Sequence, residues 1–160
     1  VLAFKLPHPI CNIYLSFLSY SILLLAFGVR PYLAIGGALA FGLSNYMIVG
    51  LSVGHSGRIG AIAFMPLIIA GIHLAFTNRR VLGFGVTAAG LSLHFRENHL
   101  QMTYYLMIIV GIYGLVQLTL FIKEKKFADF LKSLTVLIPA VVIAVGTFFG
   151  PMWAIKEYRE

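Results

Sequence analysis

A polar stretch separates two of the most apolar runs of this 160-residue chain. It reads SLHFRENHLQMTYY, at 92–105, and brings Arg96, Glu97, Asn98 and His99 in succession. Arginine binds phosphate oxygens through paired hydrogen bonds, glutamate and histidine transfer protons, and an amide both donates to and accepts from hydroxyl groups. The stretch therefore predicts either a site for an anionic ligand or a buried network of ion pairs.

A second polar stretch, GHSGR at 54–58, predicts a loop of a different kind. The glycines that flank Ser56 favour a tight turn whose backbone N–H groups, beside Arg58, bind an anionic oxygen. A serine nucleophile is not predicted, because the stretch lacks the strand–turn–helix context of such a serine. Arg58 and Arg96 fall on the same side of the expected bundle, so together they predict a phosphate site.

Several of the same residues are of types that bind metals. His94, Glu97 and His99 could act as ligands, and His55 could join them. Their spacing matches neither the HExxH pattern nor any other pair of histidines four residues apart. We therefore predict no metal site and no cofactor, with a divalent metal as an alternative that the spacing does not support. Cys11 is the only cysteine, which excludes a disulfide within the chain.

The elements that position these residues are apolar. The chain is 60% hydrophobic and 11% charged, with a mean hydropathy of +0.94, which is typical of a membrane protein. Six segments approach the ~20 residues that a spanning helix needs. They are Ile10 to Phe27, Tyr32 to Val53, Ile59 to Phe76, Val81 to Phe95, Leu100 to Ile122 and Leu131 to Gly150. We predict an all-α fold, a polytopic transmembrane bundle of about six spanning helices, as a single domain over 1–160.

The basic residues lie in the short connectors between these segments, where they anchor headgroups and set topology. The lipid bilayer is therefore the expected partner and nucleic acid is not, despite a net charge of +7. One side of the bundle carries seven Lys or Arg residues and the other side five. The set of seven is Arg30, Arg79, Arg80, Lys123, Lys125, Lys126 and Lys132. The set of five is Lys5, Arg58, Arg96, Lys156 and Arg159. The positive-inside rule assigns the first set to the cytoplasm and both chain ends to the extracytoplasmic side.

The first polar stretch is expected to lie below the outer membrane surface. The segment before it, Val81 to Phe95, has about 15 residues and rises about 22 Å, against a hydrocarbon core of about 30 Å. A helix that is polar on both sides cannot face lipid. We therefore predict a helix–loop–helix break at 96–99 that borders the protein interior or a water-filled cavity.

Glycine and alanine recur four residues apart, a spacing that lets helices approach closely. The pairs are Gly36/Ala40, Ala38/Gly42, Gly71/Ala75 and Gly85/Ala89. We predict helix–helix packing at these pairs.

Three motifs, in their order along the chain, resemble a known family. GHSGRIGAIAFMP at 54–66, ENHLQMTYY at 97–105 and EYRE at 157–160 are similar to motifs of the bacterial YfhO-type membrane proteins, in the GT-C superfamily of glycosyltransferases. The resemblance implies a GT-C-like bundle in the bacterial inner membrane. Its implied activity is transfer of a sugar from a polyprenyl-phosphate carrier to an envelope acceptor at the outer face.

The chain departs from the family pattern at Arg58, where a lysine is common, and at Phe64, where a tyrosine is common. The family's usual catalytic acidic residue lies in a first outward loop that this sequence does not contain. We therefore expect an internal fragment of a larger membrane protein, with its partners in the remainder of its own chain or in other membrane subunits.

The resemblance implies an outward cavity whose residues divide into two sets. Candidates for binding the phosphate and the substrate are Arg58, Arg96, Asn98, Gln101, Tyr104 and Tyr105. Candidates for catalysis are His55, Glu97 and His99. The catalytic base itself is expected outside the fragment, so the fragment alone is predicted to be inactive.

Two other functions stay open on the sequence. A non-catalytic transmembrane subunit of a larger complex would use 96–99 as a buried ion-pair network. A transporter segment would use Glu97 and His99 to relay protons. The residues name neither the donor sugar, the acceptor nor the oligomeric state.

Overall fold

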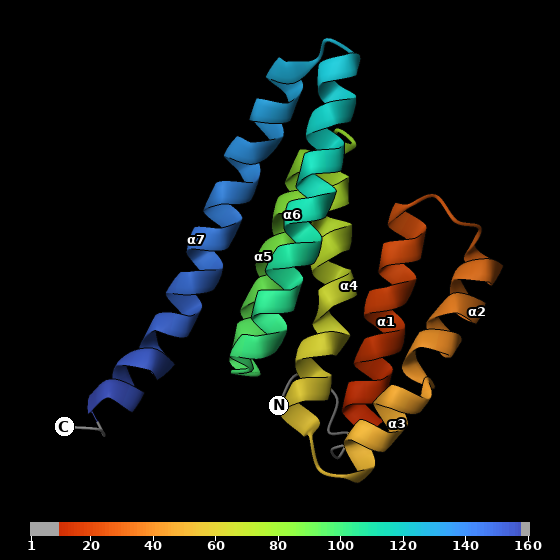
Figure 1. Cartoon of the computed structure of the whole chain (residues 1–160), viewed down its shortest axis with the longest axis vertical. Helices are drawn as coiled ribbons and strands as arrows, with labels where there is room; N and C mark the ends of the chain where they lie inside the picture. The colour runs from red at the N-terminus through yellow and green to blue at the C-terminus, as the bar shows by residue number, and fades with distance from the viewer. Residues whose placement is uncertain (1–9, 158–160) are drawn as a thin grey trace.

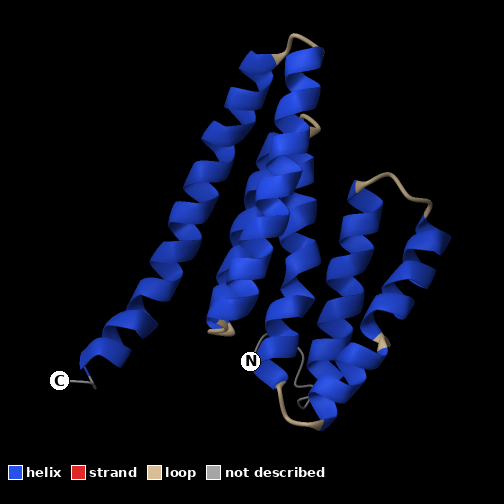
Figure 2. Ribbon diagram, in the orientation of Figure 1, coloured by secondary structure: helices blue, strands red, loops and turns tan. Residues whose placement is uncertain are grey.

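The computed structural model describes residues 10–157, with side chains for 10–150 and for Trp153. Over this range the chain forms helices joined by short turns, with no strand (Figures 1 and 2). The helices are α1 (Ile10–Ala26), α2 (Pro31–Gly42), α3 (Asn45–Ser52), α4 (Ser56–Phe76), α5 (Arg80–Arg96), α6 (Leu100–Lys123) and α7 (Phe127–Glu157). The all-helical prediction is confirmed.

The second predicted segment is two helices rather than one. The helices α2 and α3 meet at an angle of 40°. The backbone leaves the helical conformation at Ser44, whose φ and ψ of −59° and 146° are extended. Ser44 is the residue before the first turn of α3, and Leu43 is the one after the last turn of α2.

Among the described residues, three helices are long and apolar enough to cross a membrane: α4, α6 and the 127–150 part of α7. The bent pair of α2 and α3 makes a fourth if the two count as one span. The helices α1 and α5 have 17 residues each, short of the ~20 that a perpendicular span needs. The fold is thus a helical membrane protein with three or four clear spans.

The helix α4 is the centre of the bundle. Of its 21 residues, 13 are buried, and it packs against both α1 and α5, while α5 also packs against α7. By contrast, α6 buries only Met102 and Leu106 among the described residues. A helix of 24 residues with apolar side chains exposed on most sides is suited to lipid rather than to water.

Glycines allow α4 and α5 to approach closely. A Cβ added at Gly83 would lie 2.5 Å from the backbone nitrogen of Ala75, and one at Gly71 would lie 2.5 Å from that of Thr87. The predicted packing at Gly71/Ala75 is therefore confirmed. Gly42 likewise packs under the ring of Phe17, as the Ala38/Gly42 spacing predicts.

The two other predicted pairs do not pack in this way. Gly36 and Gly85 have nothing within 4 Å of an added Cβ, and their partners Ala40 and Ala89 are exposed. Small residues permit close approach but do not themselves supply a neighbouring helix. The prediction is wrong for these pairs within the described part of the chain.

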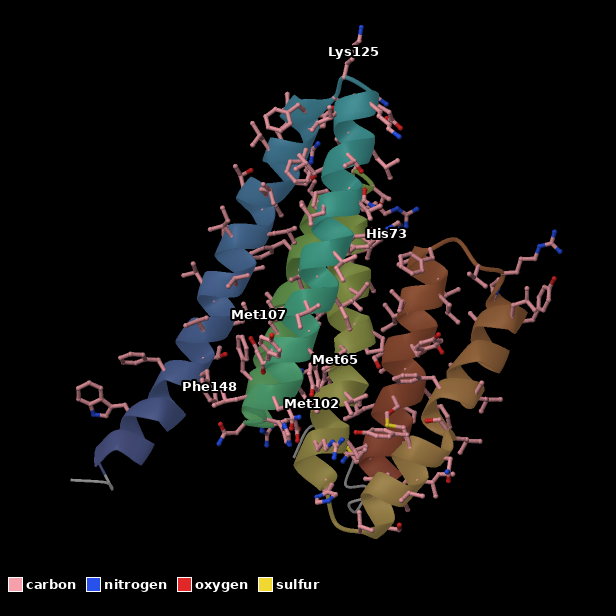
Figure 3. All side chains as sticks on the ribbon, viewed as in Figure 1. Met65, His73, Met102, Met107, Lys125 and Phe148 are labelled. Atoms are coloured by element: carbon pink, nitrogen blue, oxygen red, sulfur yellow. The ribbon has the colours of Figure 1, made fainter. Side chains whose placement is uncertain are left out.

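The end of the bundle with the α4–α5 and α6–α7 turns is held by polar bonds. Tyr113 on α6 lies 2.6 Å from Nδ1 of His73 on α4, and Gln117 donates to the same Tyr113 oxygen at 2.9 Å. Figure 3 shows His73 facing the space between the helices. Nη2 of Arg80 lies 3.3 Å from Oδ1 of Asp129, and this ion pair joins the start of α5 to α7.

Lys125 lies at the tip of the same end (Figure 3), in the α6–α7 turn with a φ of +58°. Beside it, the Glu124 carboxylate accepts a hydrogen bond from Lys126 at 2.9 Å and raises the pKa of that lysine. The turn therefore keeps its positive charge at neutral pH.

Candidate functional site

The two polar stretches lie at the same end of the bundle, opposite the α6–α7 turn (Figure 1). Glu97, in the α5–α6 turn, lies against the first turns of α4. A Cβ added at Gly60 would fall 2.5 Å from Oε2 of Glu97, and one at Gly57 would fall 3.3 Å from its carbonyl oxygen. The positive end of a helix dipole favours a carboxylate at this position. The glycines at 57 and 60 thus let the two polar stretches meet.

The predicted break between helices is confirmed. The helix α5 ends at Arg96 and α6 begins at Leu100. Asn98 adopts a φ of +51°, in the left-handed region that asparagine tolerates better than most residues. This conformation reverses the chain within three residues and leaves Asn98 exposed at the turn.

A buried histidine lies directly behind this turn. His94 is 1% exposed. Its Nδ1 lies 3.0 Å from the carbonyl oxygen of Ala61, and its Nε2 lies 3.0 Å from the hydroxyl of Thr103. A carbonyl oxygen only accepts, so Nδ1 carries the proton, and Nε2 of the neutral ring accepts from Thr103. His94 thereby joins α4, α5 and α6.

Sequence reasoning considered His94 only as a metal ligand and did not identify this network. Its partners are 33 and 9 residues away along the chain, so no local spacing reveals them. A row on α1 was also missed. Asn12 donates to the Ser56 carbonyl at 3.1 Å, and Ser19 donates to that of Ala63. With Ser16 these residues follow the i, i+4, i+7 pattern of one helix face, a signal that was present in the sequence.

One hollow at this end, the arginine hollow, lies between α3 and α4. It has a volume of about 330 Å³ and includes Asn45, Tyr46, His55 and Arg58 in its lining. The guanidinium carbon of Arg58 lies 5.3 Å from the centroid of the Tyr46 ring, within reach of a cation–π interaction. The Nε of Arg58 is buried and has no hydrogen-bond partner among the described residues.

The second, the threonine hollow, lies between α5, α6 and α7 and has a volume of about 200 Å³. Its wall is almost entirely apolar and includes Phe95 and Phe148, although Asn98, His99 and Thr103 are among the residues that border it. The two phenylalanine rings have centroids 5.9 Å apart. Figure 3 shows Phe148 on α7 at the level of the lower part of α6. The two hollows share no lining residue.

Five of the predicted residues lie outside both hollows: Arg96, Glu97, Gln101, Tyr104 and Tyr105. Arg96 and Gln101 are exposed, and Gln101 donates to the Tyr105 hydroxyl at 3.0 Å. Tyr104 is 62% exposed and Tyr105 42% exposed. The structure therefore gathers His55 with Arg58, and Asn98 with His99, but does not bring Arg58 and Arg96 into one hollow.

In the part of the chain that the structure describes, no three His, Cys, Asp or Glu residues lie where they could hold a metal ion. The predicted roles of Lys5 and Arg159, of the Lys156 side chain and of the closing EYRE motif fall outside the described residues.

The fold and the apolar spans define the class of this protein as an all-helical membrane protein. No protein-family model, no curated protein and no solved structure matches the chain.

Proposed function

We propose that this chain is part of a GT-C-like membrane glycosyltransferase with about six spans. It transfers a sugar from a polyprenyl-phosphate carrier to an envelope acceptor on the outer face of the bacterial inner membrane. Three apolar spans support its location in a membrane. The larger number of basic residues around Lys125 supports a cytoplasmic position for that end and an extracytoplasmic one for the polar stretches and both chain ends.

The observation that carries the proposal is the arginine hollow. Arg58 is half-buried in it, and one guanidinium N–H is buried with no partner in the described part of the chain. A buried donor left unpaired costs about 1–3 kcal/mol, which an incoming phosphate oxygen recovers. Arginine suits phosphate because its planar donors match two oxygens at once. The apolar part of the lining, which includes Val49, Val53 and Ile59, suits the first isoprene unit of a lipid carrier.

The remaining candidates take supporting roles in this proposal. His55 lies at the mouth of the arginine hollow, where it transfers a proton or binds the donor. Arg96, Gln101, Tyr104 and Tyr105 are exposed and contact the donor or acceptor as they approach. Glu97 and His99 orient the sugar group of the donor, while the catalytic base lies outside residues 1–160. The fragment alone would then bind the donor without transferring the sugar.

Binding of a polyprenyl phosphate to the intact protein in lipid nanodiscs tests this function. We expect Arg58→Gln to weaken binding about tenfold or more, because a hydrogen bond to a charged group contributes about 1.5–3 kcal/mol. Polyprenol, which lacks the phosphate, should bind equally to both proteins. Lys125→Gln, at the opposite end of the bundle, is the matched control. Equal losses for Arg58→Gln and Lys125→Gln would show a general charge effect and reject the site.

A non-catalytic membrane subunit is the second candidate, and the His94 network favours it. The fully buried imidazole of His94 is hydrogen-bonded to two other helices. Such a network stabilises the packing of the bundle, and that is the role expected in a structural subunit. In that case polyprenyl phosphate and polyprenol would bind alike, and the intact protein would copurify with further membrane subunits.

A further inference from the structure

An apolar groove, the α5 groove, runs along one side of α5 from its first turn. It has a volume of about 550 Å³, and its lining is Leu67 of α4 with Val81, Leu82, Gly85, Val86 and Ala89 of α5. Gly85 and Ala89 leave it open, because neither residue has a side chain beyond Cβ. A Cβ added at Gly85 meets nothing within 4 Å, and Ala89 is exposed. The described helices therefore leave this pair of small residues uncovered.

The length of the α5 groove matches one leaflet of a membrane. From Val81 to Ala89 a helix rises about 12 Å, and half of a hydrocarbon core of about 30 Å is about 15 Å. A crossing helix of another subunit would pack along the whole thickness of the membrane. An acyl chain needs only the depth of its own leaflet, so the groove fits an acyl chain better than a helix.

A cation lies where the α5 groove reaches the membrane surface. Arg79 immediately precedes α5, is exposed, and accepts a backbone hydrogen bond from Gly83 at 2.8 Å. It stands three positions before Leu82, on the same side of the helix as the groove. Its neighbour Arg80 is paired with Asp129. Among the described residues, the Arg79 guanidinium has neither a hydrogen bond nor an ion pair.

From this arrangement we propose that the α5 groove binds an anionic phospholipid of the leaflet at the α4–α5 turn. One acyl chain lies along Gly85 and Ala89, and the phosphate binds the guanidinium of Arg79. Arginine binds phosphate oxygens through paired hydrogen bonds, and basic residues at a membrane surface attract anionic headgroups. The groove supplies the apolar contact, and the charge of Arg79 supplies the preference for an anionic lipid.

This site is separate from the proposed donor site. The α4–α5 turn lies at the end of the bundle opposite α3 and the start of α4, where the arginine hollow is found (Figure 1). The inference rests on the membrane class of the fold and on the α5 groove, and it does not depend on glycosyltransferase activity.

The test uses the intact protein in phosphatidylcholine nanodiscs that contain a small fraction of phosphatidylglycerol with a photoreactive group in its acyl chain. Crosslinked peptides give the position of the lipid. Competition by unlabelled phosphatidylglycerol or phosphatidylcholine gives the headgroup preference.

Two variants, each with a matched control, test the two parts of the site. Arg79→Gln removes the charge, and Lys125→Gln is its control, because Lys125 lies at the same end of the bundle but in the α6–α7 turn (Figure 3). Gly85→Leu fills the groove. Gly111→Leu is its control, since an added Cβ at Gly111 on α6 also meets nothing within 4 Å.

We expect the wild type to be labelled most strongly at 81–89 and to prefer phosphatidylglycerol about fivefold, the value of one basic residue near an anionic surface. Arg79→Gln should lose this preference. Gly85→Leu should lose the label at 81–89. Gly111→Leu, Lys125→Gln and Arg58→Gln should all match the wild type, and agreement for Arg58→Gln would separate this site from the proposed donor site.

Equal loss of headgroup preference in Arg79→Gln and Lys125→Gln would overturn the inference, because diffuse surface charge would then explain the binding. Label spread evenly over α5 and α6 would also reject it, since the lipids would be those of the bulk membrane. A photoreactive amino acid at Ala89 that crosslinks to another polypeptide instead of to lipid would assign the groove to a protein partner. If Gly85→Leu does not fold, Arg79→Gln and the label positions on wild type decide the question.

Discussion

The two hollows lie at the same end of one bundle, yet they offer opposite chemistry. In the arginine hollow a cation lies over an aromatic ring, with one donor unpaired among the described residues. The threonine hollow is almost entirely apolar and has two aromatic rings in its wall. The helix α4 separates these environments, because its first turns face Glu97 through Gly57 and Gly60 and line the arginine hollow with Arg58.

This comparison shows that a bundle can separate a charged hollow from an apolar one at the same end. A charge in an apolar surrounding is costly unless it is paired. Separate hollows keep the guanidinium of Arg58 away from the apolar wall of the threonine hollow. The predictions below separate the two regions, from the largest expected effect to the smallest.

Gly83→Ala should have the largest effect and should act on the threonine hollow first. The added methyl would lie 2.5 Å from the Ala75 backbone nitrogen, and backbone cannot move aside as a flexible side chain can. We expect a loss of about 1–3 kcal/mol from overpacking, seen as a lower unfolding temperature in detergent. The α3–α4 contact around Arg58 should persist, because Gly83 does not contribute to it.

Gly85→Ala is the control for this change. It lies on the same helix, but an added Cβ meets nothing within 4 Å. Alanine is the better helix former by about 1 kcal/mol, so this variant should be neutral or slightly more stable. If both variants unfold at the same temperature, the close approach of α4 and α5 at Gly83 is wrong.

His94→Leu should have the second largest effect. It leaves the Ala61 carbonyl and the Thr103 hydroxyl without their partner, and an unsatisfied buried group costs about 1–3 kcal/mol. Partial relief is expected, because Thr103 can still donate to the His99 carbonyl. Thermal unfolding of the intact protein measures the loss, with His55→Leu, an exposed histidine at the same end, as the control. Equal stability of the two variants would mean that the His94 bonds contribute nothing.

Much of the fold follows from local properties of the sequence. Apolar length predicted the helices, and the succession of polar residues at 96–99 predicted the break after α5. The bend at Ser44 was missed although serine and asparagine at 44 and 45 are typical of a helix start. These features depend on neighbours in the chain, which is why a sequence can reveal them.

The division into two hollows could not be predicted in the same way. It depends on how α4 is rotated, since that rotation directs Gly60 to Glu97 and Arg58 to Tyr46. The contact of His94 with Ala61 depends on the register between α4 and α5. Polar residues on one side of a bundle suggested a single cavity, but a shared side does not fix which helix faces meet.

Tyr46→Leu should have the smallest effect and should act on the arginine hollow alone. The Tyr46 ring supports the guanidinium of Arg58 at 5.3 Å, and such a contact at a partly exposed site contributes about 0.5–1 kcal/mol. We expect affinity for polyprenyl phosphate to fall about threefold, because Arg58 then samples more orientations. Tyr46→Phe keeps the ring face and should bind as wild type does. Tyr32→Leu is the control, since Tyr32 also pairs with an arginine, accepting from Arg30 at 3.0 Å, but at the opposite end of the bundle. A loss in Tyr46→Phe as large as in Tyr46→Leu would assign the effect to the hydroxyl and remove the cation–π contact from the account of the site.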